Sequence, residues 1–147
     1  MAVARARTLV QQHRNRLVFK TLQPFRPAPS DVSESACEIR FLIGKTARKI
    51  RKYKTARRDL DFVSESCTEP WKRKALYLAA RVASYQNNKD TLKVLNRFLK
   101  IYPSSAFSDD VMVWKAEYYS RRHQYLEAEK IFGQAFRSFP KGDMGFH

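Results

Sequence analysis

The residues most able to take part in binding chemistry are eight lysines and arginines that crowd one stretch with no acidic residue among them. Such a concentration of positive charge can contact phosphate groups or an acidic partner, with an affinity that falls steeply as salt rises. Only Tyr53 interrupts the stretch, so stacking on nucleic-acid bases is not indicated. A solvated face and a localisation signal are the alternative interpretations. The residues are Lys45, Arg48, Lys49, Arg51, Lys52, Lys54, Arg57 and Arg58.

Helical spacing predicts where these charges lie. At that spacing Lys45, Lys49 and Lys52 share one side of a helix, whereas Arg48, Arg51 and Lys52 crowd a turn between two helices.

Catalytic patterns are missing from the sequence. There is no GxSxG, HExxH, P-loop or GxGxxG pattern. The three histidines are far apart and lack metal-ligand spacing, so no metal or cofactor is expected. Glycosidase chemistry needs two placed carboxylates or one acid in a supporting pocket, whereas Glu117, Glu127 and Glu129 lie at ordinary helix-surface spacing. We therefore expect a chain that is not an enzyme by itself.

Positive charge is concentrated in the first part of the chain. The 147 residues carry 29 basic and 14 acidic side chains, a formal net charge of +15. Residues 1–58 hold 15 basic and 3 acidic side chains (net +12), and residues 59–147 hold 14 and 11 (net +3). The asymmetry indicates that the first part meets nucleic acid, an acidic lipid surface or an acidic protein, or is simply a solvated basic face. No apolar run is long enough to cross a membrane.

The first thirty residues are basic and contain no acid. They match the composition of a mitochondrial transit peptide, but no serine precedes Ser30, which favours a basic helix or arm that is retained. No secretory signal is present. Pro24, Pro27 and Pro29 predict a short linker, so the expected boundaries are an arm at 1–33, a repeat domain at 34–142 and a tail at 143–147. The basic residues of the arm are Arg5, Arg7, Arg14, Arg16, Lys20 and Arg26.

The rest of the chain repeats itself. Two helix-like segments end in an aromatic residue and a proline, and Pro103 and Pro140 lie 37 residues apart. This is close to the period of about 34 residues of a helix–turn–helix repeat. The pattern predicts an all-α domain of three helical hairpins, with turns at about Arg51–Lys52, Asn87–Asn88 and 121–124.

Small residues are predicted to lie where the helices of each hairpin cross. Gly44 and Ala56 take this place in the first hairpin, since a mid-helix glycine costs about 1 kcal/mol relative to alanine and close packing would explain it. In the third hairpin, Tyr125, Ala128, Phe132 and Ala135 form one apolar stripe, facing Met112, Ala116 and Tyr119. Asp109 and Asp110 fit the start of a helix. Cys37 and Cys67 lack CxxC spacing and are expected to be buried free thiols.

Five short segments carry a family resemblance. They are RKALYLAAR at 73–81, YPSS at 102–105, DD at 109–110, WKAE at 114–117 and FPKGDM at 139–144. The small–large pattern resembles the tetratricopeptide repeat, with Lys115 and Thr91 departing from it. The segments are similar to the superhelical N-terminal region of bacterial soluble lytic murein transglycosylases.

That resemblance implies a right-handed superhelix that acts as a non-catalytic scaffold for protein–protein contacts. The lysozyme-like domain with the catalytic glutamate has no counterpart here, so the chain would be a fragment of such an enzyme or a free-standing module. The compartment would be the periplasm for a fragment, the mitochondrion for a transit peptide and otherwise the cytoplasm. The alternative is a basic helical-repeat subunit of an RNA–protein assembly such as an organellar ribosome. Phe136, Phe139 and Phe146 are expected to be partly exposed, which predicts self-association or a neighbouring domain.

Overall fold

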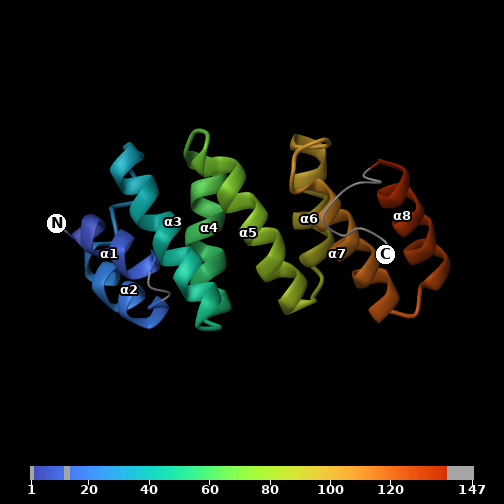
Figure 1. Ribbon diagram of the computed structural model, residues 1–147, viewed down its shortest axis with the longest axis horizontal. Helices are drawn as coiled ribbons and strands as arrows, with labels where there is room; N and C mark the ends of the chain where they lie inside the picture. The colour runs from blue at the N-terminus through green and yellow to red at the C-terminus, as the bar shows by residue number, and fades with distance from the viewer. Residues whose placement is uncertain (1, 12–13, 139–147) are drawn as a thin grey trace. The chain divides into compact units, whose positions relative to one another are not determined.

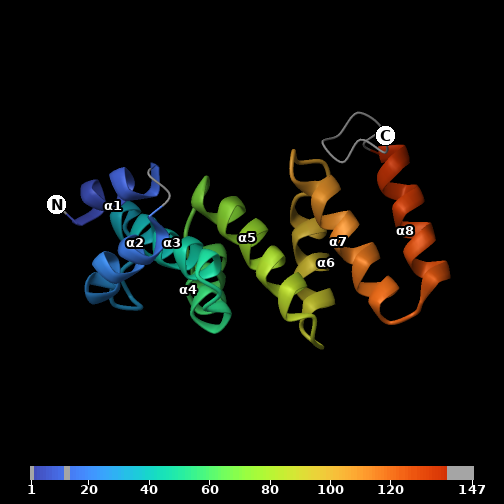
Figure 2. The same cartoon turned by 60° about the horizontal axis from the view of Figure 1, so that its bottom comes forward.

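The fold is entirely helical in the part of the chain that the structure describes. The computed structural model describes residues 2–11 and 14–138, and no strand occurs among them. The all-α class predicted from the sequence is therefore confirmed. The elements, in order, are α1 (Ala2–Gln11), α2 (Asn15–Leu22), the 3-10 turn η1 (Gln23–Phe25), α3 (Glu34–Lys49), α4 (Tyr53–Ser66), α5 (Trp71–Gln86), α6 (Thr91–Ile101), α7 (Ser108–Arg121) and α8 (Tyr125–Ser138) (Figures 1 and 2).

The chain divides into two compact units, which we call unit 1 (Met1–Val82) and unit 2 (Ala83–His147). The division falls inside α5, and so within the predicted second hairpin, whose packing stays a prediction. It differs from the boundaries expected from the sequence, because much of the predicted arm forms α1, α2 and η1 in the same unit as α3. The predicted tail at 143–147 lies outside the described residues.

The α3 and α4 helices of unit 1 pack against each other where the first hairpin was predicted. The expected close crossing is confirmed at Gly44, because a Cβ atom placed there would lie 2.7 Å from Leu60 Cγ and 2.8 Å from Leu60 Cδ2. Ala56, the second small residue, is fully buried. The interface is filled by further buried apolar residues, namely Ile43, Ala47 and Val63.

A buried carboxylate ties the N-terminal segment to this hairpin. Asp59 is fully buried on α4 and accepts hydrogen bonds from Arg26 (Nε–Oδ1 3.2 Å, Nη2–Oδ2 2.8 Å) and from Arg40 (Nη1–Oδ1 3.1 Å). Arg40 also donates to the Pro27 carbonyl oxygen at 3.0 Å and lies over the Phe62 ring, 4.0 Å from its centroid. A buried carboxylate needs such compensation, since an unpaired charge inside a protein is strongly unfavourable. We call these residues the Asp59 cluster.

The expectation of free thiols is wrong, because Cys37 and Cys67 form a disulfide. Cys37 lies in the first turn of α3 and Cys67 directly follows α4, so the bond joins the two helices at the end opposite their turn. The pairing was missed because it depends on the hairpin rather than on cysteine spacing. The cysteines lie 14 residues before and 16 residues after Arg51, which is nearly symmetric about the turn, and this symmetry is the signal that could have revealed the bond.

In unit 2, α7 and α8 pack against each other, and the turn predicted at 121–124 is confirmed. α7 ends at Arg121, His123 has a left-handed φ of 60°, and α8 begins at Tyr125. The predicted stripe is correct for Ala116, Ala128 and Ala135, which are buried, but not for Tyr125, which is 59% exposed. As the first residue of α8, Tyr125 lies by the turn, where its hydroxyl is 2.7 Å from His123 Nδ1.

The structure gives a role to three polar residues of unit 2. Thr91, which departs from the predicted repeat pattern, is buried, and its hydroxyl donates a 2.7 Å hydrogen bond to the Ala83 carbonyl oxygen. This bond satisfies a hydroxyl that burial would otherwise penalise. Asp109 and Asp110 lie in the first turn of α7, as predicted from the helix macrodipole.

Candidate anion-binding surface

The last turns of α3 hold the part of the basic stretch that is richest in uncompensated charge. Burial lowers the pKa of Lys45, and the nearby charges of Arg48, Lys49 and Lys74 lower it further. The Arg48 Nε atom is buried and has no hydrogen-bond partner among the described residues. Lys49 is exposed at the last position of the helix. Each of these residues therefore adds to a region of positive potential with no acid next to it.

Arg51 and Lys52 lie in the turn between α3 and α4. Arg51 is exposed and has a left-handed φ of 64°. Lys52 lies over the Phe19 ring of α2, 5.1 Å from its centroid, which is within the range of a cation–π contact. Helical spacing predicted that Lys52 lies on the same side of a helix as Lys45 and Lys49. This prediction is wrong, because α3 ends at Lys49.

The α4 part of the basic stretch contains one paired and two exposed residues. Arg57 pairs with Asp61 one turn later, with an Nη2–Oδ2 distance of 3.1 Å. Arg58 lines a cavity of about 370 Å³, whose other lining residues include Arg40 and Phe62. Lys54 is exposed. The eight predicted residues are thus distributed over α3, the turn and α4 rather than gathered on one face.

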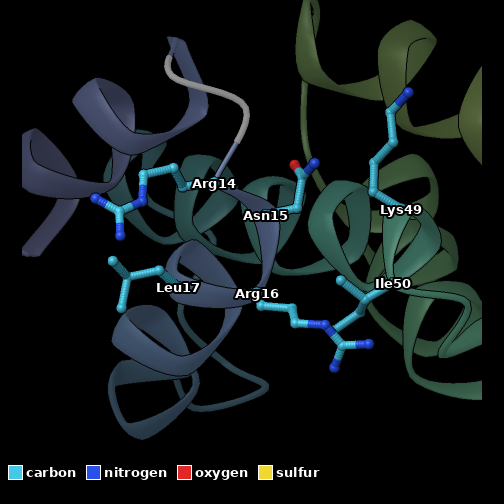
Figure 3. Close-up of a pocket in the computed structure, with 6 residues that line it drawn as sticks. All are labelled: Arg14, Asn15, Arg16, Leu17, Lys49 and Ile50. Carbon is cyan, nitrogen blue, oxygen red and sulfur yellow. The ribbon is translucent and has the colours of Figure 1, made fainter.

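A cavity of about 410 Å³ is lined by residues at the start of α2 and at the end of α3, and we call it the α2–α3 cleft (Figure 3). The Asn15 side chain lies between Arg14 and Lys49, and the Arg16 side chain extends beside Ile50. Arg14 and Arg16 belong to the arm predicted from the sequence, which gives no sign that they lie near Lys49. No local pattern could make that connection, because it depends on the packing of α2 against α3. The lining residues are Arg14, Asn15, Arg16, Leu17, Lys49 and Ile50.

Comparison of the chain with known protein families, with curated proteins and with solved structures finds no match. The resemblance to the transglycosylase superhelix therefore stays a prediction. Among the described helices, none is both long and apolar enough to cross a membrane.

Proposed function

We propose that this chain is a non-catalytic helical-repeat scaffold that makes protein contacts through α8, and that a second copy of the chain occupies this surface. The observation that carries the proposal is the presence of three exposed apolar side chains on α8. Leu126 is 84% exposed, Tyr125 59% and Phe136 51%. Tyr125 and Phe136 are 11 residues apart, close to three helical turns, so they lie on the same side of the helix. Exposed apolar groups gathered in this way are typical of interaction surfaces.

Charge favours α8 as the place for self-association. The first part of the chain repels a second copy, because residues 1–58 carry a net charge of +12. The net charge of residues 59–147 is only +3, so apolar contact there meets less Coulomb opposition. The scaffold role is the one implied by the resemblance to the superhelical region of lytic transglycosylases, and the close-packed α3–α4 and α7–α8 pairs support it.

Sedimentation velocity over a range of protein concentrations tests the proposal. We expect the wild type to self-associate, and the association to persist at high salt because the contact is apolar. The double variant Leu126→Glu/Phe136→Glu should weaken it by at least about tenfold, since two apolar contacts are worth roughly 1.5–3 kcal/mol each. The control Phe25→Glu changes an equally exposed aromatic residue in unit 1 (58% exposed) and should leave association unchanged. A wild type that stays monomeric throughout, or equal losses in both variants, would contradict the proposal.

The second candidate function is that of a basic subunit in an RNA–protein assembly. It is favoured by the mutual repulsion of Lys45, Arg48, Lys49 and Lys74, which marks a surface where positive charge is not balanced. A salt titration of RNA binding, with Lys49, Arg51 and Lys52 changed to Glu, tests this candidate. If the wild type does not bind RNA at low salt, the candidate fails.

A further inference from the structure

The α2–α3 cleft combines room for a ligand with unbalanced positive charge. Its volume of about 410 Å³ is within the usual size of small-molecule sites. Three of its lining residues, Arg14, Arg16 and Lys49, are cationic and exposed. No lining residue is acidic. None of the three side chains makes a hydrogen bond or an ion pair with another described residue. Their charges are therefore available to a ligand.

Three acids of unit 1 are paired with arginines that do not line the cleft. Glu38 accepts two hydrogen bonds from Arg7, at 2.8 and 2.9 Å. Asp59 is held by Arg26 and Arg40, and Asp61 pairs with Arg57. Positive charge also continues from Lys49 along α3, where burial and, to a lesser degree, the charges of Arg48, Lys49 and Lys74 lower the pKa of Lys45.

The start of α2 adds to this field. Arg14 precedes α2 and makes no side-chain hydrogen bond to its first turn, so the positive end of the α2 dipole faces the cleft region without a cap. The opposing negative end of α3 is partly satisfied, because Ile50 N donates to the Thr46 carbonyl oxygen and Lys52 N to the Ala47 carbonyl oxygen, at 3.1 and 2.8 Å.

We infer that the α2–α3 cleft binds phosphate groups through Arg14, Arg16 and Lys49. A guanidinium presents paired N–H donors that match two phosphate oxygens, whereas a lysine ammonium acts as a point charge. The Asn15 amide supplies a neutral donor between them. The charged ends of Arg14 and Lys49 point apart in Figure 3, so a phosphate is expected to draw exposed, rotatable side chains together. The phosphate can belong to a nucleic-acid backbone or to a small phosphorylated molecule.

This inference goes beyond the scaffold function and would supply a contact site for the RNA-binding candidate. Two probes separate the sources of phosphate: pyrophosphate, followed by titration calorimetry, and a single-stranded uridine oligonucleotide, followed by fluorescence anisotropy. The variant Arg14→Gln/Arg16→Gln removes two cleft cations from exposed positions. The matched control Lys89→Gln/Lys93→Gln removes two exposed cations from unit 2.

We expect the full-length wild type to bind at least one probe at low salt. The cleft variant should weaken that binding at least about tenfold, and the control by less than about twofold. For the oligonucleotide, the slope of log affinity against log salt should fall by about 1.4, because two phosphate contacts of about 0.7 each are lost. Circular dichroism verifies the helix content, and Lys49→Gln, at the end of the longer α3, provides a second test if α2 unfolds. Binding of pyrophosphate alone identifies a small ligand, and binding of the oligonucleotide alone identifies a nucleic acid; both support the inference.

Three results would overturn it. These are no binding of either probe, equal losses in the cleft and control variants, and binding of poly-glutamate that matches the phosphate probes and is lost with the same residues. A fourth contrary result is oligonucleotide binding that is unaffected by Arg14→Gln/Arg16→Gln and by Lys49→Gln alone, but is abolished when Lys49, Arg51 and Lys52 are changed together. It would contradict the cleft and leave the RNA candidate supported. Self-association through α8 is measured independently of all these outcomes.

Discussion

The α3–α4 pair of unit 1 and the α7–α8 pair of unit 2 are both antiparallel helical hairpins, but they are held together in different ways. α3 and α4 are joined by a disulfide, by the Asp59 cluster and by the direct contact of Gly44 with Leu60. α7 and α8 bury small and apolar side chains. Near their turn, Arg121 and Arg122 make part-buried hydrogen bonds to Ser84 and Asn87 rather than across the hairpin, and two further polar contacts are exposed. These are the His123–Tyr125 hydrogen bond and the Arg121–Glu117 pair, whose Nη2–Oε2 distance is 3.9 Å.

Two helical hairpins of one chain can therefore be stabilised by different kinds of interaction. Removing one partner of a buried ion pair leaves an uncompensated buried charge. Removing a disulfide raises the conformational entropy of the unfolded state. Both changes lower stability. Packing of small residues is more tolerant, and exposed ion pairs contribute little. Substitutions at matched positions of the two hairpins should therefore have unequal effects.

The largest effect is expected at Asp59. Asp59→Ala should lower the free energy of unfolding by about 3–5 kcal/mol, because it leaves Arg26 and Arg40 without their shared carboxylate. Urea denaturation followed by circular dichroism measures the loss. Asp61→Ala, which removes the partly exposed partner of Arg57, is the control and should cost less than about 1 kcal/mol. Similar losses at the two positions would show that the Asp59 cluster is not a special support of unit 1.

The second largest loss of stability is expected on removal of the disulfide. Replacing Cys37 and Cys67 by Ser should lower the free energy of unfolding by about 3–4 kcal/mol in the chain-entropy account, given their separation of 30 residues. Denaturation of the wild type with and without reductant provides the same comparison without mutation. A midpoint that reductant and the double substitution both leave unchanged would mean that the bond does not support the hairpin.

A glycine-to-alanine pair compares the two hairpins directly. Gly44→Ala should lower the free energy of unfolding by about 1–2 kcal/mol, since overpacking against Leu60 outweighs the gain in helix propensity. Gly133→Ala should raise it by up to about 1 kcal/mol, because the nearest atom to the added Cβ is the flexible Arg137 Nη1 at 3.4 Å. Thermal and urea unfolding measure both variants. Stabilisation by Gly44→Ala would contradict the close crossing of α3 and α4.

The smallest effect is expected at Lys45. Its pKa is lowered by burial and by Arg48, Lys49 and Lys74, so the folded state holds the proton less tightly than the unfolded state. Between the lowered pKa and the ordinary value of 10.5, the unfolded state binds more protons, and stability should rise with pH in that window.

Lys45→Met should therefore raise stability at neutral pH by about 0.5 kcal/mol and flatten the rise toward high pH. Urea midpoints measured at several pH values test this expectation. Lys93→Met, at an exposed position on α6, is the matched control. A variant at Lys45 that is less stable than the wild type at neutral pH would indicate that Lys45 stabilises its surroundings.

The periodic part of the fold could be predicted because local spacing determines it. Apolar periodicity located the helices around Ala56 and Ala128, and the mid-helix Gly44 indicated a close crossing that the structure confirms. Tyr125 shows the limit of this approach. Its spacing matched the buried stripe, but its place at the start of α8 leaves it by the turn.

The features that were missed join residues far apart in the chain. The disulfide and the α2–α3 cleft both depend on which helices pack together, and nothing local to Cys37 or Arg14 encodes the partner. The predicted exposure of Phe136 is confirmed, whereas the predictions for Phe139 and Phe146 fall outside the described residues.

The Asp59 cluster also bears on proteolytic maturation. Cleavage after residue 30 would remove Arg26 and the Pro27 carbonyl group, and with them one of the two arginines that hold the buried carboxylate. It would also remove Val18 and Leu22, whose side chains are fully buried, and so open the core of unit 1. The described residues among the first thirty, 2–11 and 14–30, therefore contribute to the core of unit 1, and their loss should destabilise that unit.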